Sequence, residues 1–226
     1  MKANVSEIFE SIQGEGILVG VRQLFIRFSE CNLRCYYCDT VTDREKCKDF
    51  VSRKTLRNPI SLEYIQSLVD NAKCIHSVCF TGGEPMLYAD FISSLRKTKP
   101  FYLETNMSLP EQAEKLKFVD YVAGDLKIRE AGNPNYEELL ERTVRSFKIL
   151  RNCGKRLTFC KIVLPEKFDG EEVLSSAELI KDYVYCFVLQ PVFGVKLDEI
   201  LRLQKRMIEF KDTRLIPQVH KYLGVR

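Results

Sequence analysis

Apolar segments of strand length alternate with amphipathic helical patterns along most of this chain. Segments rich in β-branched and aromatic residues predict strands at 23–28, 78–81, 101–104, 121–125, 157–164, 186–190 and 214–219. Apolar residues at helical spacing predict helices at 61–72, 89–97, 110–116, 136–150, 171–181 and 196–210. Ser61 is a suitable N-cap for the first helix. The alternation predicts a parallel sheet with helices packed outside it.

The number of strand–helix units restricts the architecture. Six β/α units in 226 residues are too few for a closed eight-fold barrel, which typically needs roughly 250 residues. We therefore expect an α/β fold in which the strands form an open, partial (β/α)6 barrel. Because no linker rich in Pro, Gly or Ser divides the sequence, residues 1–226 are expected to form a single domain.

Polar motifs follow the ends of the predicted strands. Arg27 ends the first strand, Thr81-Gly82-Gly83-Glu84-Pro85 follows the second, Glu104-Thr105-Asn106 the third, Asp125-Leu126-Lys127 the fourth, and Gln190-Pro191 the sixth. Each motif alone is typical of a turn. In a parallel β/α fold, however, the carboxyl ends of the strands meet at one face, so the five motifs together predict an active site there. Two adjacent glycines would let the backbone come close to a ligand.

Three cysteines lie in one short loop, at Cys31, Cys35 and Cys38. Their spacing allows three thiolates to surround one inorganic cluster. A structural zinc site needs four protein ligands and a conventional four-iron cluster takes four thiolates, so a three-cysteine loop leaves one metal position open. The open position predicts a reactive cluster.

The composition is typical of a soluble globular protein. The chain is 45% hydrophobic and 29% charged, which is ordinary for a soluble domain. It shows neither a signal-peptide pattern nor an apolar stretch of membrane-span length, so we expect a cytoplasmic protein without a membrane partner. Nine cysteines in that compartment predict reduced thiols. The net charge of +4 is too weak to predict a nucleic-acid surface.

Several other features are expected to be structural. The basic run at 44–57 is mixed with acidic residues and predicts a solvated loop rather than a nucleic-acid contact. The six remaining cysteines lack paired spacing, and Cys79, Cys160 and Cys186 fall in predicted strands, where they are expected to be small buried residues. His76 has no metal-ligand partner at useful spacing.

Two motifs together resemble the radical S-adenosylmethionine (SAM) superfamily. They are the three-cysteine loop, with Tyr37 before its last cysteine, and the Gly-Gly-Glu-Pro turn after the second strand. The resemblance covers nearly the whole chain and implies an open partial barrel of the radical SAM type. It also implies a [4Fe-4S] cluster on the three cysteines, with SAM bound at the open iron. In such enzymes reductive cleavage of SAM gives a 5′-deoxyadenosyl radical that abstracts hydrogen from substrate, while the protein holds the cofactor against that substrate.

Within the superfamily the sequence is most similar to the family of 7-carboxy-7-deazaguanine synthases. These lyases convert 6-carboxy-tetrahydropterin to 7-carboxy-7-deazaguanine on the way to queuosine. The resemblance is carried by residues 7–16, which match the family's N-terminal substrate loop, by Arg27, by Cys38-Asp39-Thr40, and by residues 218–224.

The family resemblance implies a role for each matched position. Substrate contacts are implied for Ile12, Gln13, Gly14, Arg27 and Thr81, and catalytic roles for Arg27, Glu15, Glu104 and His220. SAM contacts are implied for Tyr37, Asp39, Gly82, Gly83, Glu84, Lys127 and Gln190, and a Mg²⁺ contact for Thr40. An external electron donor of the flavodoxin or ferredoxin type, a small pterin or deazapurine substrate and a homodimer are also implied.

Two departures from the family pattern leave alternatives open. Asp125-Leu126-Lys127 stands where the family usually has Ser-Pro-Lys, and Met107 follows the third strand's motif. One alternative is a related enzyme acting on another 7-deazapurine, such as a queuine lyase in salvage. A glycyl-radical activating enzyme is less favoured, because the substrate-loop and C-terminal motifs indicate a small molecule. A non-catalytic cluster module would not need the Gly-Gly-Glu-Pro turn.

Overall fold

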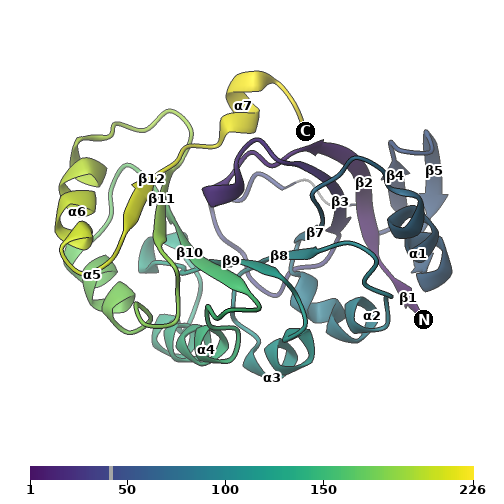
Figure 1. The fold of residues 1–226 in the computed structure, drawn as a ribbon. Helices are drawn as coiled ribbons and strands as arrows, with labels where there is room; N and C mark the ends of the chain where they lie inside the picture. Colours follow the sequence, from purple (N-terminus) through teal and green to yellow (C-terminus); the bar gives the residue numbers. More distant parts are fainter. Residues whose placement is uncertain (41–42) are drawn as a thin grey trace.

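A ten-stranded sheet curves around the centre of the molecule, with helices on its outer side (Figure 1). The computed structural model describes residues 1–40 and 43–226. Seven consecutive strands of this sheet run parallel. They are β3 (Arg22–Phe28), β7 (Ser77–Gly82), β8 (Phe101–Thr105), β9 (Tyr121–Asp125), β10 (Leu157–Leu164), β11 (Phe187–Pro191) and β12 (Thr213–Leu215).

Helices follow the parallel strands and pack outside them. They are α1 (Leu62–Asn71), α2 (Ala89–Ser93), α3 (Pro110–Ala113), α4 (Tyr136–Ile149), α5 (Gly170–Glu178) and α6 (Asp198–Ile208). Ser61 caps α1 as predicted, since its side chain accepts from the Tyr64 N–H. The sheet does not close on itself, so the predicted open (β/α)6 barrel is confirmed.

Several elements end earlier than their patterns predict, and the difference is largest for α2 and β12. Helix α2 stops at Ser93, where the Ser93 and Ser94 hydroxyls both donate to the Asp90 carbonyl and compete with helical bonding. Strand β12 stops at Leu215, and Pro217 lacks the N–H that a continuing ladder would need. The last predicted strand therefore turns instead into a short helix, α7 (Val219–Leu223).

The N-terminal part of the chain extends the sheet with strands that were not predicted. Strand β2 (Val5–Ile12) pairs antiparallel with β3, so only the end of the 7–16 segment is a loop. A register shift between Val5 and Glu7 interrupts the regular alternation that would have revealed β2. Two short strands, β1 (Lys2–Ala3) and β6 (Ile60–Ser61), form a separate pair.

The basic run at 44–57 is a β-hairpin rather than the solvated loop that its charge pattern suggested. Strand β4 (Lys46–Asp49) pairs with β2 and with β5 (Lys54–Arg57). Cys47 and Asp49 are buried while the lysines between and beside them face solvent. Asp49 accepts hydrogen bonds from the hydroxyls of Tyr64 and Ser52, both at 2.5 Å, which fixes the hairpin to α1.

The apolar core has two parts because side chains alternate along each strand. The outward-facing set packs against the helices and includes Leu24, Val78, Leu103, Val122, Ile162 and Leu189. The inward-facing set fills the barrel interior and includes Phe25, Cys79, Tyr102, Ala123, Phe159 and Val188. Cys79, Cys160 and Cys186 are buried, as predicted.

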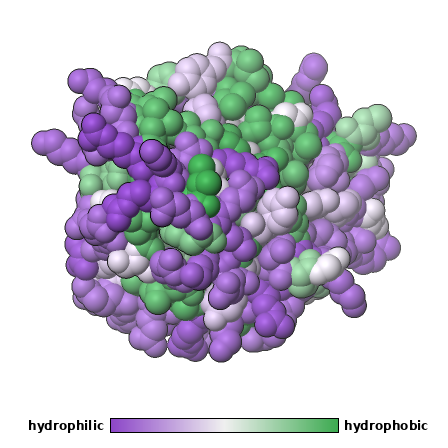
Figure 2. Space-filling view, turned by 60° about the vertical axis from the view of Figure 1, so that its left-hand side comes forward, coloured by the Kyte–Doolittle hydropathy of each residue, from purple (hydrophilic) through white to green (hydrophobic). Residues whose placement is uncertain are grey.

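Part of the molecule's surface carries exposed apolar side chains. Figure 2 shows hydrophobic groups toward the top of that view and a mostly hydrophilic surface below. Exposed large apolar residues of the C-terminal half include Phe193, Leu197, Tyr222 and Leu223, on α7 and the segment before α6. Among residues 1–40 and 43–226, no helix is long and apolar enough to cross a bilayer.

Candidate active site

A layer of polar side chains lies directly above the apolar filling of the barrel. Each of its members stands two residues beyond an inward-facing core residue and therefore points to the same interior face. The layer consists of Arg27 on β3, Thr81 on β7, Glu104 on β8, Asp125 on β9, Lys161 on β10 and Gln190 on β11. All six line one cavity of about 710 Å³ at the carboxyl ends of the strands.

The predicted site residues come together in that cavity, with one exception. Its walls include Ile12, Gln13, Gly14, Glu15, Arg27, Cys31, Cys35, Tyr37, Cys38, Asp39, Thr40, Thr81, Gly82, Gly83, Glu104, Lys127, Gln190 and His220. Glu84 is the exception, because it is fully buried beneath the cavity and does not line it.

The loop after β2 is held by hydrogen bonds to the polar layer. Gln13 donates from Nε2 to Glu104 Oε1 (2.9 Å) and to Gln23 Oε1 (3.0 Å), and its Oε1 accepts from the Glu15 N–H (2.9 Å). Thr81 donates to the other oxygen of Glu104 at 2.6 Å. Polar groups from three elements are therefore fixed in place beside the open part of the cavity.

Glu15 is an ionised carboxylate in this arrangement. Its Oε2 lies 2.5 Å from Lys161 Nζ, and its Oε1 accepts from Gln218 Nε2 at 2.8 Å. Burial alone would raise the pKa of Glu15, but the charge of Lys161 and the two hydrogen bonds outweigh burial and lower the pKa to about 2. At neutral pH Glu15 can accept hydrogen bonds or pair with a cation.

Asp125 is paired with lysines on both sides. Lys127 Nζ lies 2.8 Å from Asp125 Oδ2, and Lys161 Nζ lies 3.6 Å from Asp125 Oδ1. Burial opposes the charge of Lys127, yet Asp125 and its hydrogen bond raise the pKa of Lys127 above its usual value. The same ammonium lies over the ring of Tyr37, 5.6 Å from its centroid. The site therefore contains the alternating charge chain Glu15–Lys161–Asp125–Lys127.

Arg27 faces the cavity from the opposite side of the barrel. Its Nε lies 3.1 Å from Glu7 Oε2, and its guanidinium carbon stands 5.4 Å from the ring centroid of Phe9. The Arg27 side chain is 23% exposed, so its guanidinium can reach a ligand in the cavity. Glu7 also accepts from Arg226 at 2.7 Å.

The cysteine loop lies over the other end of the cavity, where Cys31 and Cys38 are exposed and Cys35 is half-buried. N–H donors approach two of the sulfurs: Leu33 N is 3.4 Å from Cys31 Sγ, and Asn133 Nδ2 is 3.3 Å from Cys35 Sγ. Burial raises the pKa of the Cys31 thiol. N–H donors of this kind favour the thiolate and tune an iron–sulfur cluster, so these residues fit such a group.

A cubane cluster places different demands on the cysteines than a single metal ion does. Among residues 1–40 and 43–226, no three His, Cys, Asp or Glu side chains are gathered closely enough to hold one ion. In a four-iron cubane each thiolate binds a different iron, so the sulfurs surround the cluster rather than converge on one point. Cys31, Cys35 and Cys38 share the wall of one cavity, which meets that requirement.

The Gly-Gly-Glu-Pro turn supports the beginning of the cysteine loop. Gly83 N donates to Phe28 O (2.9 Å) and Glu84 N to Glu30 O (2.6 Å). Gly82 has a φ of +109°, and a Cβ on Gly83 would lie 1.9 Å from Glu30 O. Only glycine fits at these two positions, because the turn packs directly on the backbone that leads to Cys31.

The carboxylate of Glu84 accepts three hydrogen bonds from groups of the protein. It accepts from Thr105 Oγ1 (2.6 Å), from the Asn106 N–H (2.7 Å) and from the Met86 N–H (2.9 Å). Burial raises the pKa of Glu84 to about 7 despite these hydrogen bonds. Glu84 thus joins the segments after β7 and β8, and the SAM contact that its motif implies stays a prediction.

Some buried polar atoms on the cavity wall have no protein partner. Among the described residues, these include the Tyr37 hydroxyl and Gln190 Oε1. Burial raises the pKa of Tyr37 to about 12, so the hydroxyl is a neutral donor. An unsatisfied buried polar group costs free energy unless a ligand or water satisfies it. Both atoms are therefore suited to contact a polar ligand.

The C-terminal segment 218–226 crosses from β12 to the N-terminal strands over the open part of the barrel, with α7 at its centre (Figure 1). Val219 N donates to Gly14 O at 2.8 Å, and the His220 ring stacks so closely on Gly14 that a Cβ there would clash. Lys221 forms an ion pair with Asp39 of the cysteine loop. The segment therefore connects the substrate-loop match to the cysteine loop.

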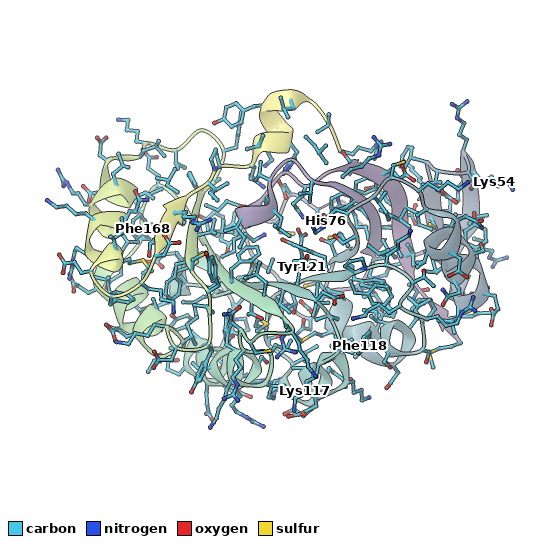
Figure 3. All side chains as sticks on the ribbon, viewed as in Figure 1. Lys54, His76, Lys117, Phe118, Tyr121 and Phe168 are labelled. Carbon is cyan, nitrogen blue, oxygen red and sulfur yellow. The ribbon has the colours of Figure 1, made fainter. Side chains whose placement is uncertain are left out.

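His76 does not line the cavity of this site. It precedes β7, and its ring lies 5.2 Å from that of Tyr121 at the beginning of β9, inside the ring of strands (Figure 3). Its Nδ1 is 3.0 Å from Ser77 Oγ. These contacts agree with the structural role predicted from its lack of metal-ligand spacing.

The sequence analysis missed Lys161, Gln218 and Glu7 as site residues. Lys161 is a charged residue inside the otherwise apolar segment 157–164, two positions after Phe159, which is the signal that could have revealed it. Gln218 was assigned to a strand, and Glu7 lies on the strand that was not predicted.

The open barrel, the three-cysteine loop and the polar strand layer define an enzyme that holds an iron–sulfur cluster beside its substrate. The sequence model of the Radical SAM superfamily matches residues 25–180. The 7-carboxy-7-deazaguanine synthase of Archaeoglobus fulgidus is 67% identical over 226 residues, covering all of both chains. The enzyme of the same name from Methanothermobacter thermautotrophicus is 34% identical, covering all of this chain and 99% of the relative.

A solved structure has the same fold. QueE from Escherichia coli superimposes with a TM-score of 0.59 at 19% identity, over 97% of this chain and 95% of that one. The chain therefore belongs to the radical SAM superfamily and, within it, to the family of 7-carboxy-7-deazaguanine synthases. It is a radical SAM enzyme, and its family implies a [4Fe-4S] cluster and SAM as cofactors.

Proposed function

We propose that this protein converts 6-carboxy-tetrahydropterin to 7-carboxy-7-deazaguanine, a carbon–nitrogen lyase reaction of queuosine-pathway metabolism. The observation that carries the proposal is the position of Arg27, whose guanidinium faces the same cavity as the three cysteines. A planar, permanently charged donor suits a bidentate pair with a carboxylate. The full-length likeness to synthases of that name supports the same substrate.

The chain supplies hydrogen-bond donors and acceptors around the proposed pterin. Arg27 binds its carboxylate, and Glu7, which pairs with both Arg27 and Arg226, keeps its hydrogen bond from Arg226. The fixed hydrogen-bonding groups of Gln13, Thr81 and Glu104 meet the ring's donors and acceptors, with Ile12 and Gly14 completing the wall. His220 covers Gly14 from the C-terminal segment.

The cysteine end of the cavity holds the cofactors. When bound on Cys31, Cys35 and Cys38, the cluster and SAM supply the 5′-deoxyadenosyl radical that abstracts hydrogen from the substrate. Polar groups available for SAM are the Tyr37 hydroxyl, Asp39, Lys127, Gln190 and the backbone of Gly82 and Gly83. The buried carboxylate of Glu84 is left out of this set.

We assign Thr40 to a Mg²⁺ ion that is held jointly with the substrate. The Thr40 side chain lines the cavity next to the cysteine loop. One hydroxyl is a poor ligand set alone, and Mg²⁺ typically completes its octahedron with waters and substrate oxygens. The ion is therefore expected to bind with the pterin rather than before it.

The Asp125 departure does not call for another substrate. Its carboxylate is engaged by Lys127 and Lys161 in a buried ion-pair chain, so it compensates charges of the protein itself. That pairing weakens the case for a queuine lyase or for a glycyl-radical activating enzyme.

We further propose the cellular partners of the enzyme. They are an electron donor of the flavodoxin or ferredoxin type and a second copy of the chain in a homodimer. We also propose a cytoplasmic location. Tyr36, which lies between Cys35 and Cys38, is exposed, so an electron donor can approach the cluster loop there.

The experiment is a product analysis under anaerobic conditions. Cluster-reconstituted protein with SAM and reductant is supplied with 6-carboxy-tetrahydropterin, with queuine, or with buffer alone. Mass spectrometry should find 7-carboxy-7-deazaguanine and 5′-deoxyadenosine only with the pterin. A new product from queuine and none from the pterin would overturn the proposal.

A further inference from the structure

A buried lysine in the polar layer has no part in the proposed cofactor or substrate contacts. The Lys161 side chain is 9% exposed, and its ammonium lies 2.5 Å from Glu15 and 3.6 Å from Asp125. A buried ammonium is costly unless it is closely paired, so its place in an apolar strand requires compensating contacts. Two carboxylates from different elements provide that compensation.

The two partners of Lys161 come from different elements of the chain. Glu15 is on the loop after β2 and also accepts from Gln218 of the C-terminal segment. Asp125 is on β9 and already has Lys127 at 2.8 Å. The shorter contact is to Glu15, whose only other side-chain donor in the described chain is Gln218. Glu15 therefore depends on Lys161 more than Asp125 does.

Glu15 in turn connects a loop and a terminal segment. The Glu15 N–H donates to Gln13 Oε1, and the neighbouring Gly14 carbonyl accepts from the Val219 N–H. A displacement of Glu15 would move Gln13 and release Gln218. Both consequences would open the wall of the cavity against which the pterin is proposed to bind.

We propose that Lys161 is a positioning residue that holds Glu15, and through it the 13–16 loop and Gln218, in the arrangement that receives the substrate. The inference rests on the proposed function only for the identity of that substrate. The competing explanation is that Lys161 merely neutralises Asp125 inside the barrel. The two explanations predict different double variants.

The first test compares single variants of the cluster-loaded enzyme. Lys161→Met keeps the length of the side chain but removes its charge, and should raise KM for 6-carboxy-tetrahydropterin about 100-fold, the effect of breaking a buried charge pair. The loss should fall on KM much more than on kcat, and Lys161→Arg should recover much of it. Lys115→Met, which breaks an exposed ion pair with Asp90, is the matched control and should behave like the parent.

Double variants separate the two explanations. If Lys161 acts through Glu15, then Glu15→Gln/Lys161→Met should be little worse than either single variant. Asp125→Asn/Lys161→Met removes both charges, should fold even if Lys161→Met alone does not, and should remain defective in KM. Recovery of KM in that second double variant, or a change below about threefold in Lys161→Met, would overturn the inference.

Hydrogen–deuterium exchange gives a readout that does not depend on the substrate. Peptides covering residues 13–20 and 217–226 should exchange about tenfold faster in Lys161→Met than in the parent, while peptides from α4 are unchanged. Unchanged exchange at both segments would contradict the positioning role. If exchange rises as expected but the parent does not bind the pterin, the proposed function fails and the positioning role stands.

Discussion

The two ends of the cavity are built in different ways. At the strand end, the side chains of Glu104, Glu15 and Asp125 form hydrogen bonds or ion pairs with neighbours on other elements. At the cysteine end, two of the three thiols are exposed and few backbone hydrogen bonds hold the loop, among them Tyr36 N to Ala131 O at 3.2 Å. The strand end is preorganised by the fold, whereas we expect the cysteine end to gain stability when its inorganic group binds.

Removing one cysteine should have the largest effect, because the cluster loop has no substitute ligand. We expect Cys35→Ser to lose the cluster's visible absorbance and all SAM cleavage. Cys79→Ser, at a buried thiol of the barrel interior, should keep both. The measurements are iron content and visible absorbance after anaerobic reconstitution. A full iron content in Cys35→Ser would show that the loop does not hold the cluster.

The ionised carboxylate of Glu15 should make the free energy of unfolding depend on pH. Its pKa in the folded protein, about 2, is below the ordinary value of 4.5, so Glu15 stabilises the fold above pH 4.5 and loses that contribution as the pH falls through about 2. Glu15→Gln should therefore lower the free energy of unfolding at pH 7 by about 3 kcal/mol, with the difference shrinking toward pH 2.

Urea unfolding of the cluster-free chains at a series of pH values measures this difference. Glu10→Gln is the control, since Glu10 forms a surface pair with Arg22 and should change stability by less than about 1 kcal/mol. Equal, pH-independent losses in both variants would mean that the Glu15–Lys161 pair does not stabilise the strand end.

Substitution of Arg27 should change the affinity of the preorganised end for its ligand. Arg27→Lys cannot form a bidentate pair with a carboxylate, so its affinity for 6-carboxy-tetrahydropterin should fall by about 2 kcal/mol, or roughly 30-fold. Arg22→Lys lies on the same strand in an exposed pair and serves as the control. Equal affinities of the two variants would remove Arg27 from the carboxylate site.

Substitution of Thr40, which lines the cavity next to the cysteine loop, should have the smallest effect on turnover. Turnover of the parent should rise a few-fold with added Mg²⁺, and Thr40→Ala should respond much less because it lacks the hydroxyl ligand. The effect is small because substrate and water supply most of the other ligands. Thr55→Ala, at an exposed position of β5, is the control. The same Mg²⁺ response in Thr40→Ala as in the parent would contradict the assignment.

The same contrast explains what could be predicted from the sequence. The cysteine end was found because Cys31 to Cys38 are contiguous and their spacing is chemically specific. Much of the strand end was found as well, because Thr81 and Glu104 begin polar motifs at the ends of apolar segments. The partial barrel followed from the alternation of strands and helices.

What could not be predicted depends on pairings across the fold. Lys161 is separated from Glu15 by 146 positions, and only the curvature of the sheet brings them within 2.5 Å. The motif of Glu84 predicts a SAM contact but does not reveal that its carboxylate is buried and accepts three hydrogen bonds from the protein. Strand β2 was missed because its register shift breaks the alternation that marks a strand.

The central claim is that the preorganised strand end recognises a carboxylated pterin beside the cluster. The most direct measurement is a titration of the cluster-loaded parent protein, in the presence of SAM, with 6-carboxy-tetrahydropterin and with queuine. We predict saturable binding of the pterin and at least about 30-fold weaker binding of queuine, which lacks the carboxylate that Arg27 would pair. Tight queuine binding with none of the pterin would contradict the account.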